Sequence, residues 1–272
     1  MKLYVSADIE GVAGVVSPDQ TLQTGFEYET ARRWMTEETL AVCEAALDNG
    51  VTHIVVSDSH GNGQNLLLDA FPSSVEIVRN WPRPLGMMQG IEDGDYVGAI
   101  LLGYHTGAHH SGGVLAHTMA GRIFTELRLN GRPASETMLS AAIAGHFATP
   151  VLMATGDRDY VIHAEELLGD IVCVETKTGY GRISARTLTP NAACEKLAAA
   201  VPKALDRRGR TPFKIETPVV LEVDFQRHLG AELLSYLPGV ERTASKTIRF
   251  EGADMTNISK FLAVVAHYSY SL

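Results

Sequence analysis

The sequence predicts an α/β fold, with a mostly parallel central sheet flanked by helices and a smaller α/β subdomain at the C-terminal end. Two observations lead to this prediction. Short apolar runs rich in β-branched residues alternate with longer segments of helical periodicity through the 272 residues, and this alternation is typical of sheets built from β-α units. Apolar residues make up 45% and charged residues 20% of the chain, a balance that lets a soluble protein bury a sizeable core.

The first hundred residues carry clear strand and helix signals. Residues 2–7 (KLYVSA) and 51–57 (VTHIVVS) are short apolar runs, which is typical of buried strands. Between them, residues 26–49 place apolar side chains at helical spacing and stop at Gly50, so this segment is predicted to be a helix. Further strands are expected at 75–78 and 96–103.

The middle of the chain predicts a hairpin followed by alternating helices and strands. Residues 122–129 alternate between apolar and polar side chains, and Asn130-Gly131 follows as a hairpin turn. Ser135 is a favourable N-cap for a helix over 136–147. The next elements are expected, in order, as a strand at 150–155, a helix at 157–168, a strand at 171–176 and a helix at 190–205.

A change in composition marks the expected domain boundary. Residues 206–211 (DRRGRT) are charged and contain glycine, and Pro212 follows. We therefore expect a main domain over 1–206 and a small C-terminal α/β subdomain over 207–272. Its elements are expected as a strand at 219–225, a short helix at 231–236, a strand at 242–250 and a helix at 253–268.

Charge and cysteine content narrow the class of protein. The net charge of −9 argues against a nucleic-acid partner, because phosphate backbones are bound by clustered Lys and Arg. No apolar run approaches the roughly 20 residues that a membrane helix needs. The three cysteines, Cys43, Cys173 and Cys194, are odd in number and far apart, and the first residues lack a signal-peptide layout. We expect a cytoplasmic protein with no nucleic-acid or membrane partner.

Side chains that bind divalent metals follow three of the predicted strands. Asp8 and Glu10 follow the first, His60 the second and His105 a later one. Each one alone is equally well explained by an acidic turn, a polar loop or a packed histidine. Their repetition is the stronger signal, because the carboxyl ends of parallel strands meet at the edge of a sheet where ligands bind.

Two further residues extend this set. Glu136 opens a predicted helix, where the helix dipole alone also favours an acid, and His117 lies in an apolar loop, where a histidine held by the backbone is the alternative. Three carboxylates (Asp8, Glu10 and Glu136) and two imidazoles (His60 and His105) at one sheet edge are typical of a hydrolytic metal centre.

Three other residues that could bind or orient a ligand lie near these motifs. Asp58 is either a further ligand or a partner that orients His60. His109 and His110 lie in a glycine-rich loop and are expected to be exposed.

Several short blocks together resemble one family. Residues 2–11 (KLYVSADIEG) resemble the opening of the bacterial zinc-dependent D-aminopeptidases associated with dipeptide-transport operons. Later blocks of the same family are matched in the same order: SDSH at 57–60, LGYH at 102–105, AHTM at 116–119, and NGRP at 130–133 followed by Glu136. The resemblance covers nearly the whole chain and is sparse after about residue 190. The ordered set is specific, although no single block is.

The resemblance implies two zinc ions per subunit. Carried over residue by residue, Asp8 would bridge both ions, Glu10 and Glu136 would complete one, and His60 and His105 the other. These assignments come from the family and not from the spacing of the residues in this sequence.

The resemblance also implies an activity and an assembly. His117 matches the catalytic histidine, described in the family as a nucleophile. Family members release amino-terminal D-residues from short peptides such as D-alanyl-D-alanine, and they form ring-stacked homodecamers whose active sites face an inner channel. One departure is a slightly longer loop from His105 to His117, with the extra pair His109-His110, which bears on specificity at the channel side.

Other function classes remain open from the residues themselves. A metal centre of this kind also fits another binuclear hydrolase, such as a phosphoesterase or an amidohydrolase, although phosphate chemistry usually places Arg or Lys near the metals. Only Arg122 and Arg132 flank the motifs. A dipeptide-binding protein without enzymatic activity is the third possibility. If the chain is a peptidase, a metal-activated water is expected to attack the peptide, with His117 as proton donor or oxyanion stabiliser.

Overall fold

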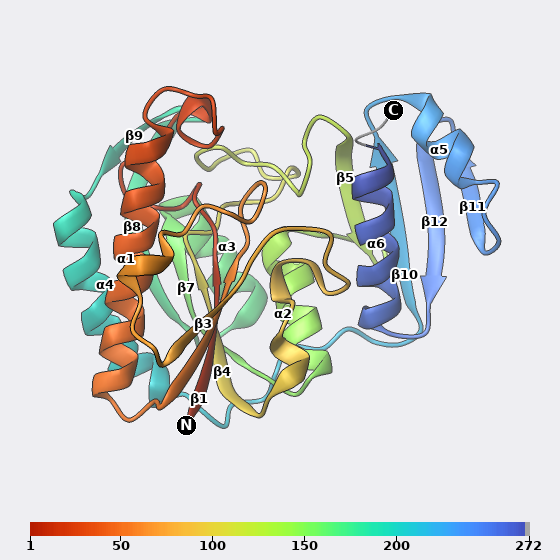
Figure 1. Cartoon of the computed structure of the whole chain (residues 1–272). Coiled ribbons are helices and arrows are strands. Elements are labelled where there is room, and N and C mark those ends of the chain that lie inside the picture. Colours follow the sequence, from red (N-terminus) through yellow and green to blue (C-terminus); the bar gives the residue numbers. More distant parts are fainter. Residues whose placement is uncertain (270–272) are drawn as a thin grey trace.

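The computed structural model describes residues 1–269, so the last three residues of the expected C-terminal subdomain lie outside it. Two sheets form its framework (Figure 1). The first contains β1 (Lys2–Ala7), β2 (His53–Asp58), β3 (Val75–Val78), β4 (Tyr96–Leu102), β7 (Val151–Asp157), β8 (Val172–Gly181) and β9 (Ser184–Thr187). The second contains β5 (Phe124–Leu129), β6 (Arg132–Pro133), β10 (Val219–Phe225), β11 (Val240–Ala244) and β12 (Thr247–Gly252).

The two sheets differ in strand direction. The first has the order β3-β2-β1-β4-β7-β8-β9, and its neighbours pair in parallel except for β8 and β9. The second has the order β11-β12-β10-β5-β6 and is antiparallel throughout. The predicted fold class, a mostly parallel sheet flanked by helices with a smaller α/β part, is confirmed.

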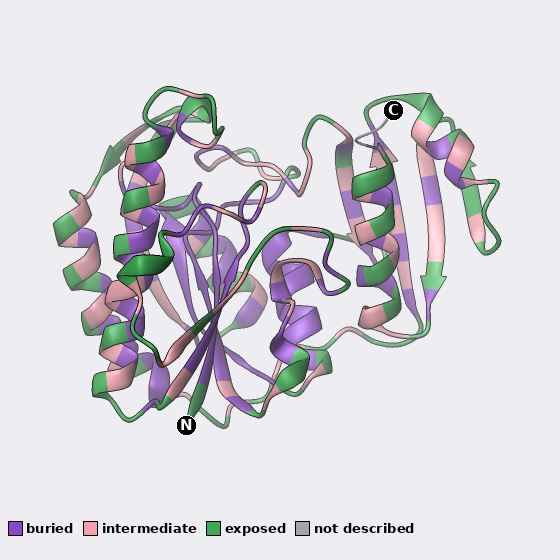
Figure 2. Cartoon of the chain, in the orientation of Figure 1, coloured by how far each residue is buried: buried purple, intermediate pink, exposed green. Residues whose placement is uncertain are grey.

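Helices cover both faces of the first sheet. They are α1 (Tyr28–Asp48) and α4 (Pro190–Leu205) on one face, and α2 (Glu136–His146) and α3 (Arg158–Leu168) on the other. The remaining helices, α5 (His228–Leu234) and α6 (Met255–Ser269), pack on the second sheet. Along β1, Leu3 and Val5 belong to the core shared with α1 and α4, while Tyr4 belongs to the core shared with α2 and α3. Successive side chains point to opposite faces of a strand, so the central strands are buried on both sides, as Figure 2 shows in purple.

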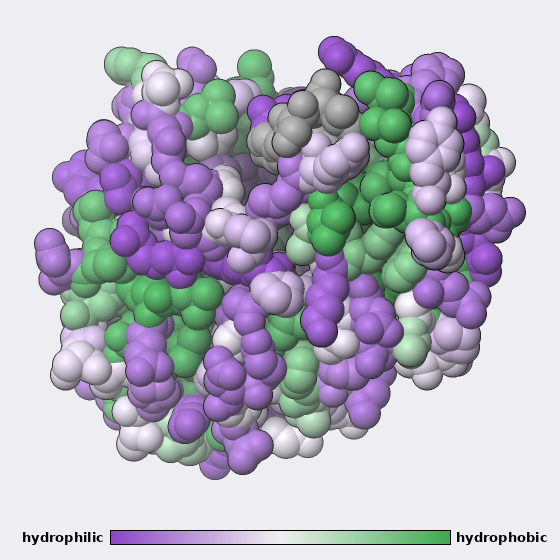
Figure 3. Space-filling view, turned by 45° about the vertical axis from the view of Figure 1, so that its right-hand side comes forward, coloured by the Kyte–Doolittle hydropathy of each residue, from purple (hydrophilic) through white to green (hydrophobic). Residues whose placement is uncertain are grey.

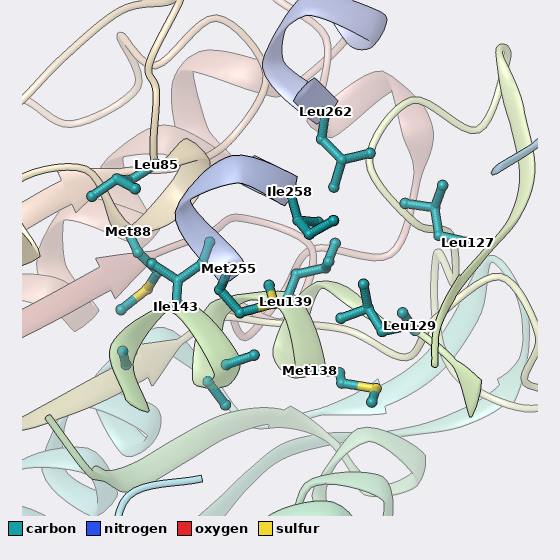
Figure 4. Packing of buried hydrophobic residues seen from close by; sticks show 14 of the residues in the cluster. Leu85, Met88, Leu127, Leu129, Met138, Leu139, Ile143, Met255, Ile258 and Leu262 are labelled. Carbon is teal, nitrogen blue, oxygen red and sulfur yellow. The ribbon is translucent and has the colours of Figure 1, made fainter. Parts of the chain in front are cut away.

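Helix α2 connects the two sheets. Every residue from Glu136 to Gly145 is buried, as expected for a helix that is apolar on all sides. Leu139 and Ile143 of α2 pack in one cluster with Met255 and Ile258 of α6 and with Leu127 of β5 (Figure 4). The same helix therefore contacts the first sheet and the helix that covers the second.

The largest departures from the predicted elements are in two strands. Residues 171–176 were expected as a short strand, but β8 extends to Gly181 and turns back into β9, because Gly179 and Gly181 lie inside an exposed hairpin instead of ending the strand. Residues 242–250 were expected as one strand, but β11 and β12 pair with each other. The turn between them contains Ser245 and Lys246 and lacks Gly, Pro and Asn, the residues from which a turn is usually predicted.

The domain boundary near residue 206 stays a prediction. It falls after α4 and before β10, yet β5 and β6 come from inside 1–206 and belong to the second sheet. Figure 3 shows a hydrophobic area on the side of the molecule that carries this sheet. Four short 3-10 turns complete the described chain: Pro18–Gln20, Leu68–Ala70, Gly86–Met88 and Ile91–Asp93. Within residues 1–269, no helix combines the length and apolarity needed to cross a bilayer.

Candidate metal centre

The predicted ligands come together at the carboxyl edge of the first sheet. Asp8 and Glu10 follow β1, His60 follows β2, His105 follows β4, and Glu136 is the first residue of α2. All five are buried, each with 9% or less of its surface exposed. The strands are parallel neighbours in the order β2-β1-β4, so their ends deliver these side chains to one place.

Two glycines allow the loops after β1 and β4 to touch. Gly11 donates its N–H to the carbonyl oxygen of Gly103 at 2.7 Å. A Cβ on Gly11 would lie 2.1 Å from the Tyr104 oxygen, and one on Gly103 would lie 2.3 Å from the Asp8 oxygen. Gly103 also has φ +69°, in the left-handed region. Glycine is therefore required at both positions for Asp8 and His105 to approach each other.

The ligand atoms form two adjoining groups. In the first, His60 Nδ1 lies 3.3 Å from Asp8 Oδ1 and 3.1 Å from Glu10 Oε2. In the second, His105 Nε2 lies 3.5 Å from Glu136 Oε1, and His117 Nε2 lies 3.8 Å from the same oxygen. Each group places three possible ligand atoms within 4.8 Å of one another, and all the residues that supply these atoms are buried or partly buried.

Asp8 contacts both groups. Its Oδ1 faces His60, and its Oδ2 lies 3.5 Å from His105 Nε2. The family resemblance pairs Glu10 with Glu136 and His60 with His105. The structure instead places Glu10 beside His60, and Glu136 beside His105. Asp8 is the one residue that reaches both pairs within the described chain.

Each imidazole is held from outside by a backbone carbonyl. His60 Nε2 lies 2.8 Å from Thr21 O, His105 Nδ1 lies 2.9 Å from Thr106 O, and His117 Nδ1 lies 2.9 Å from Leu115 O. A carbonyl oxygen only accepts, so these outer nitrogens donate a hydrogen. In the neutral ring the inner nitrogen then presents a lone pair to the centre, which is how metal-binding histidines are usually oriented.

Buried polar atoms without partners also point to a cation. Glu10 Oε2 and His105 Nε2 are buried and have no hydrogen-bond partner. Leaving such atoms unsatisfied costs free energy, and a bound divalent ion would satisfy both. Carboxylate and imidazole are ligands that zinc accepts, so the residues present fit the metal that the resemblance implies.

Burial and neighbouring charges shift the pKa values of the three carboxylates. Burial, together with the charge of Glu10, raises the pKa of Asp8 to about 7. Burial also raises the pKa of Glu136, but the neighbouring His105 outweighs it and leaves the value below normal. His60 does the same for Glu10, whose pKa lies well below its usual range. The carboxylates therefore require positive charge beside them.

The histidines show the reverse effect. Burial lowers the pKa of His105, but Glu136 more than reverses this and raises it to about 10. Burial also lowers the pKa of His60, but Glu10 and Asp8 outweigh burial and raise this pKa well above normal. Without a metal, the imidazolium groups supply the positive charge that the carboxylates need. His117 differs, because burial and then the charge of His105 lower its pKa.

His117 is fixed by its ring and its backbone. The ring stacks on His105 with centroids 4.1 Å apart and planes 10° apart. Leu115 and Met119 on either side have φ of 57° and 58°, which is uncommon for residues other than glycine. Met119 N–H donates to Glu136 Oε1 at 2.6 Å. The loop thus holds the His117 ring toward the second group.

Asp58 has neither of its two expected roles. Its carboxylate accepts from the backbone N–H groups of Asn65 and Leu66 at 2.6 and 2.8 Å and from the Asn65 side chain at 2.7 Å. Asn65 in turn donates to the His60 carbonyl at 2.7 Å. Asp58 therefore shapes the loop that carries His60, while Thr21 holds the ring.

Lys177 was missed by the sequence prediction. It is 2% exposed, and its Nζ donates to the carbonyls of Glu10, Val12 and Val15. Burial lowers its pKa to about 8. It thereby fixes the loop after β1 that presents Glu10. No signal in the sequence connects residues 167 positions apart.

The loop between His105 and His117 forms a second histidine group. His109 is exposed as expected, but His110 is only partly exposed, and its ring meets that of His163 with centroids 4.4 Å apart. His163, on α3, is buried and bonds Ser135 Oγ at 2.8 Å. The sequence prediction also missed His163, because a histidine at helical spacing resembles ordinary packing.

Comparison with known proteins identifies the family of this chain. A family model described as D-aminopeptidase matches residues 1–264. The D-aminopeptidase of Bacillus subtilis (strain 168) is 31% identical over 269 residues, which cover 97% of this chain and 96% of that protein. Among solved structures, the Zn-dependent D-aminopeptidase DppA from Bacillus subtilis, described as a self-compartmentalizing protease, aligns with a TM-score of 0.94 at 29% identity, over 100% of this chain and 99% of that chain. The protein is therefore a member of the D-aminopeptidase family.

Proposed function

We propose that this protein is a metallo-aminopeptidase that uses two zinc ions per subunit to release amino-terminal D-residues from short peptides. One observation carries the proposal. His60, His105 and His117 each give their outer ring hydrogen to a backbone carbonyl and turn the other nitrogen toward buried carboxylates. The zinc dependence of the similar Bacillus subtilis enzyme supports the choice of metal.

The ligands divide according to the two groups of atoms. Glu10 and His60 would hold one ion, and Glu136 and His105 the other. Asp8 would bridge them, because its two oxygens face different groups. When bound, zinc supplies a water of lowered pKa and a Lewis acid for the peptide carbonyl.

His117 is the proposed catalytic residue. Its Nδ1 hydrogen is committed to Leu115 O, so Nε2 is the atom that exchanges a proton at the centre. Burial and the charge of His105 keep the His117 pKa low, which favours a neutral ring that accepts a proton from the attacking water. The same nitrogen then gives this proton to the leaving amine. Direct attack by the imidazole, the role described in the family, is the alternative.

The substrate and setting are proposed in the same way. We infer short D-amino-acid peptides as substrates, a homodecamer as the assembly, and a cytoplasmic location. The description of the solved relative as self-compartmentalizing supports an assembly. The three cysteines are free, which is compatible with a reducing compartment.

Metal removal and replacement tests the proposal. Purified protein is treated with EDTA, then reloaded with zinc, and hydrolysis of D-Ala-D-Ala and L-Ala-L-Ala is followed beside elemental analysis. We expect about two zinc ions per chain, loss and recovery of activity, and preference for the D-dipeptide. Hydrolysis of a phosphodiester without peptidase activity would favour another metal hydrolase, and dipeptide binding without turnover would favour a binding protein.

A further inference from the structure

A polar cavity lies beside the segment that carries His117. It has a volume of about 340 Å³ and is lined by three segments: the loop from His110 to Ala116, Asp159 in the first turn of α3, and the end of the β8–β9 hairpin at 179–182. Figure 1 shows the yellow-green loop between β4 and β5 passing beside this hairpin. The volume is within the range of small-molecule sites.

Glycines keep this cavity open. Gly112, Gly113, Gly179 and Gly181 form much of its wall. A Cβ on Gly112 would lie 3.0 Å from the Asp159 carboxylate, and a Cβ on Gly113 would lie 2.1 Å from Thr106 Oγ1. The absence of side chains at these positions lets the loop pass close to Asp159 and leaves polar space beside it.

Two residues of opposite charge line the cavity and form no ion pair with each other. Asp159 and Arg182 both line it. Among residues 1–269, no ion pair within 4.0 Å joins Asp159 to Arg182 or either one to another charged group. A molecule that carries a carboxylate and an ammonium group is complementary to this arrangement, because Arg binds carboxylates with paired hydrogen bonds. Tyr180, 73% exposed, adds an aromatic surface for a side chain.

The cavity is tied to the catalytic loop through Arg182. Leu115 N–H donates to Arg182 O at 2.9 Å, and Arg182 Nη1 donates to Ala116 O. Leu115 O is also the acceptor that fixes the His117 ring. The two residues before His117 are therefore held by the same arginine that faces the cavity.

We propose that this cavity binds a free α-amino acid, with Arg182 pairing with its carboxylate and Asp159 with its ammonium group. This is the class of molecule that peptide hydrolysis releases, so the identity of the occupant, but not the binding itself, rests on the proposed function. The site is separate from the metal ligands and assigns a role to the glycine- and histidine-rich loop.

Calorimetric titration of the zinc-loaded full-length protein tests this site. The probe is D-alanine, with L-alanine alongside it, and the controls N-acetyl-D-alanine and D-alaninamide each lack one of the two charges. We expect both controls to bind at least about 10-fold more weakly than D-alanine, the range for a lost charged hydrogen bond. Equal binding of the controls, or no D-alanine binding to the wild-type protein, would overturn the proposal.

Variants separate this cavity from the metal centre. Arg182→Gln and Asp159→Asn are each expected to weaken D-alanine binding about 10-fold or more, and Arg182→Lys to retain part of it. Arg186→Gln, an exposed arginine on the same hairpin, is the matched control and should bind as the wild type. Zinc content is measured for each variant. Wild-type affinity in both cavity variants, or loss of binding only together with zinc, would place the ligand at the metals and refute the site.

This design keeps the two proposals apart. If the cavity variants lose D-alanine binding while none of the proteins hydrolyses D-Ala-D-Ala, the site stands and the proposed peptidase activity fails. If hydrolysis is normal but Arg182 and Asp159 have no effect on D-alanine binding, the activity stands and the site fails.

Discussion

Two groups of histidines lie on either side of Ser135 and Glu136, and they differ in their neighbours. His105 and His117 surround Glu136, whereas His163 contacts Ser135 and meets the His110 ring edge-on. Carboxylates raise the pKa of His105 to about 10, while burial and then the neighbouring imidazoles lower that of His163 to about 4. The neighbouring carboxylates, and not the number of histidines, distinguish a site for cations from a packed cluster.

The largest expected effect comes from removing a carboxylate from the group of histidines that lies beside Glu136. Asp8→Asn removes the negative charge that faces both groups, so we expect both zinc ions to be lost and activity to fall at least about 10³-fold. Elemental analysis and D-Ala-D-Ala hydrolysis measure the two effects. Asp69→Asn, at an exposed position, is the control. Two zinc ions retained in Asp8→Asn would remove Asp8 from the ligand set.

His117→Ala separates catalysis from metal binding. We expect activity to fall about 10²–10⁴-fold, the usual contribution of a proton-transfer residue, while zinc stays near two per chain. His228→Ala, at an exposed position on α5, should behave as the wild type. Loss of one zinc ion on His117→Ala would instead make this residue a ligand.

Lys177→Met tests whether the hydrogen bonds of Lys177 fix the loop that presents Glu10. The change leaves three buried carbonyls without their donor. We expect zinc affinity to weaken by about 10–100-fold, as for other residues that orient a ligand. Competition with a chromophoric chelator measures it, with Lys203→Met at an exposed position as the control. A lower melting temperature with unchanged zinc affinity would limit Lys177 to folding.

His163 should make the histidine cluster sensitive to acid. The pKa of His163 in the folded protein is about 4, below its ordinary value of 6.5. Between these two pH values the unfolded chain therefore binds more protons than the folded protein. Stability from this group is therefore present above pH 6.5 and is lost as pH falls toward 4. Urea unfolding of EDTA-treated protein at pH 7 and pH 5 should show about 1–2 kcal/mol less acid destabilisation in His163→Gln than in the wild type. Equal losses in both proteins would contradict this assignment.

The smallest effect is expected at the exposed end of the same cluster. His109→Ala should leave zinc content unchanged and the free energy of unfolding within about 0.5 kcal/mol of the wild type, because His109 is exposed and no carboxylate pairs with it in the described chain. Elemental analysis and urea unfolding check both quantities. A fall in zinc content would show that the two histidine groups are not independent.

The sequence was sufficient where one local rule governs the structure. Helix α4 and strand β10 were predicted with their observed bounds, because apolar periodicity and flanking Pro and Thr mark them. Asp8, His60 and His105 were expected together because parallel strand ends share an edge. Lys177 and His163 could not be predicted, since their partners are distant in sequence and are brought near only by packing.

Helix α2 carries a consequence for any attempt to shorten this protein. It presents Glu136 at one end and rests its flank on α6, while β5 pairs with β10. A chain cut at residue 206 would expose that flank to water and leave β5 with an open edge, a template for aggregation. The proposed metal centre is therefore not separable from the segment after residue 206, even though residues 207–269 contain none of its candidate ligands.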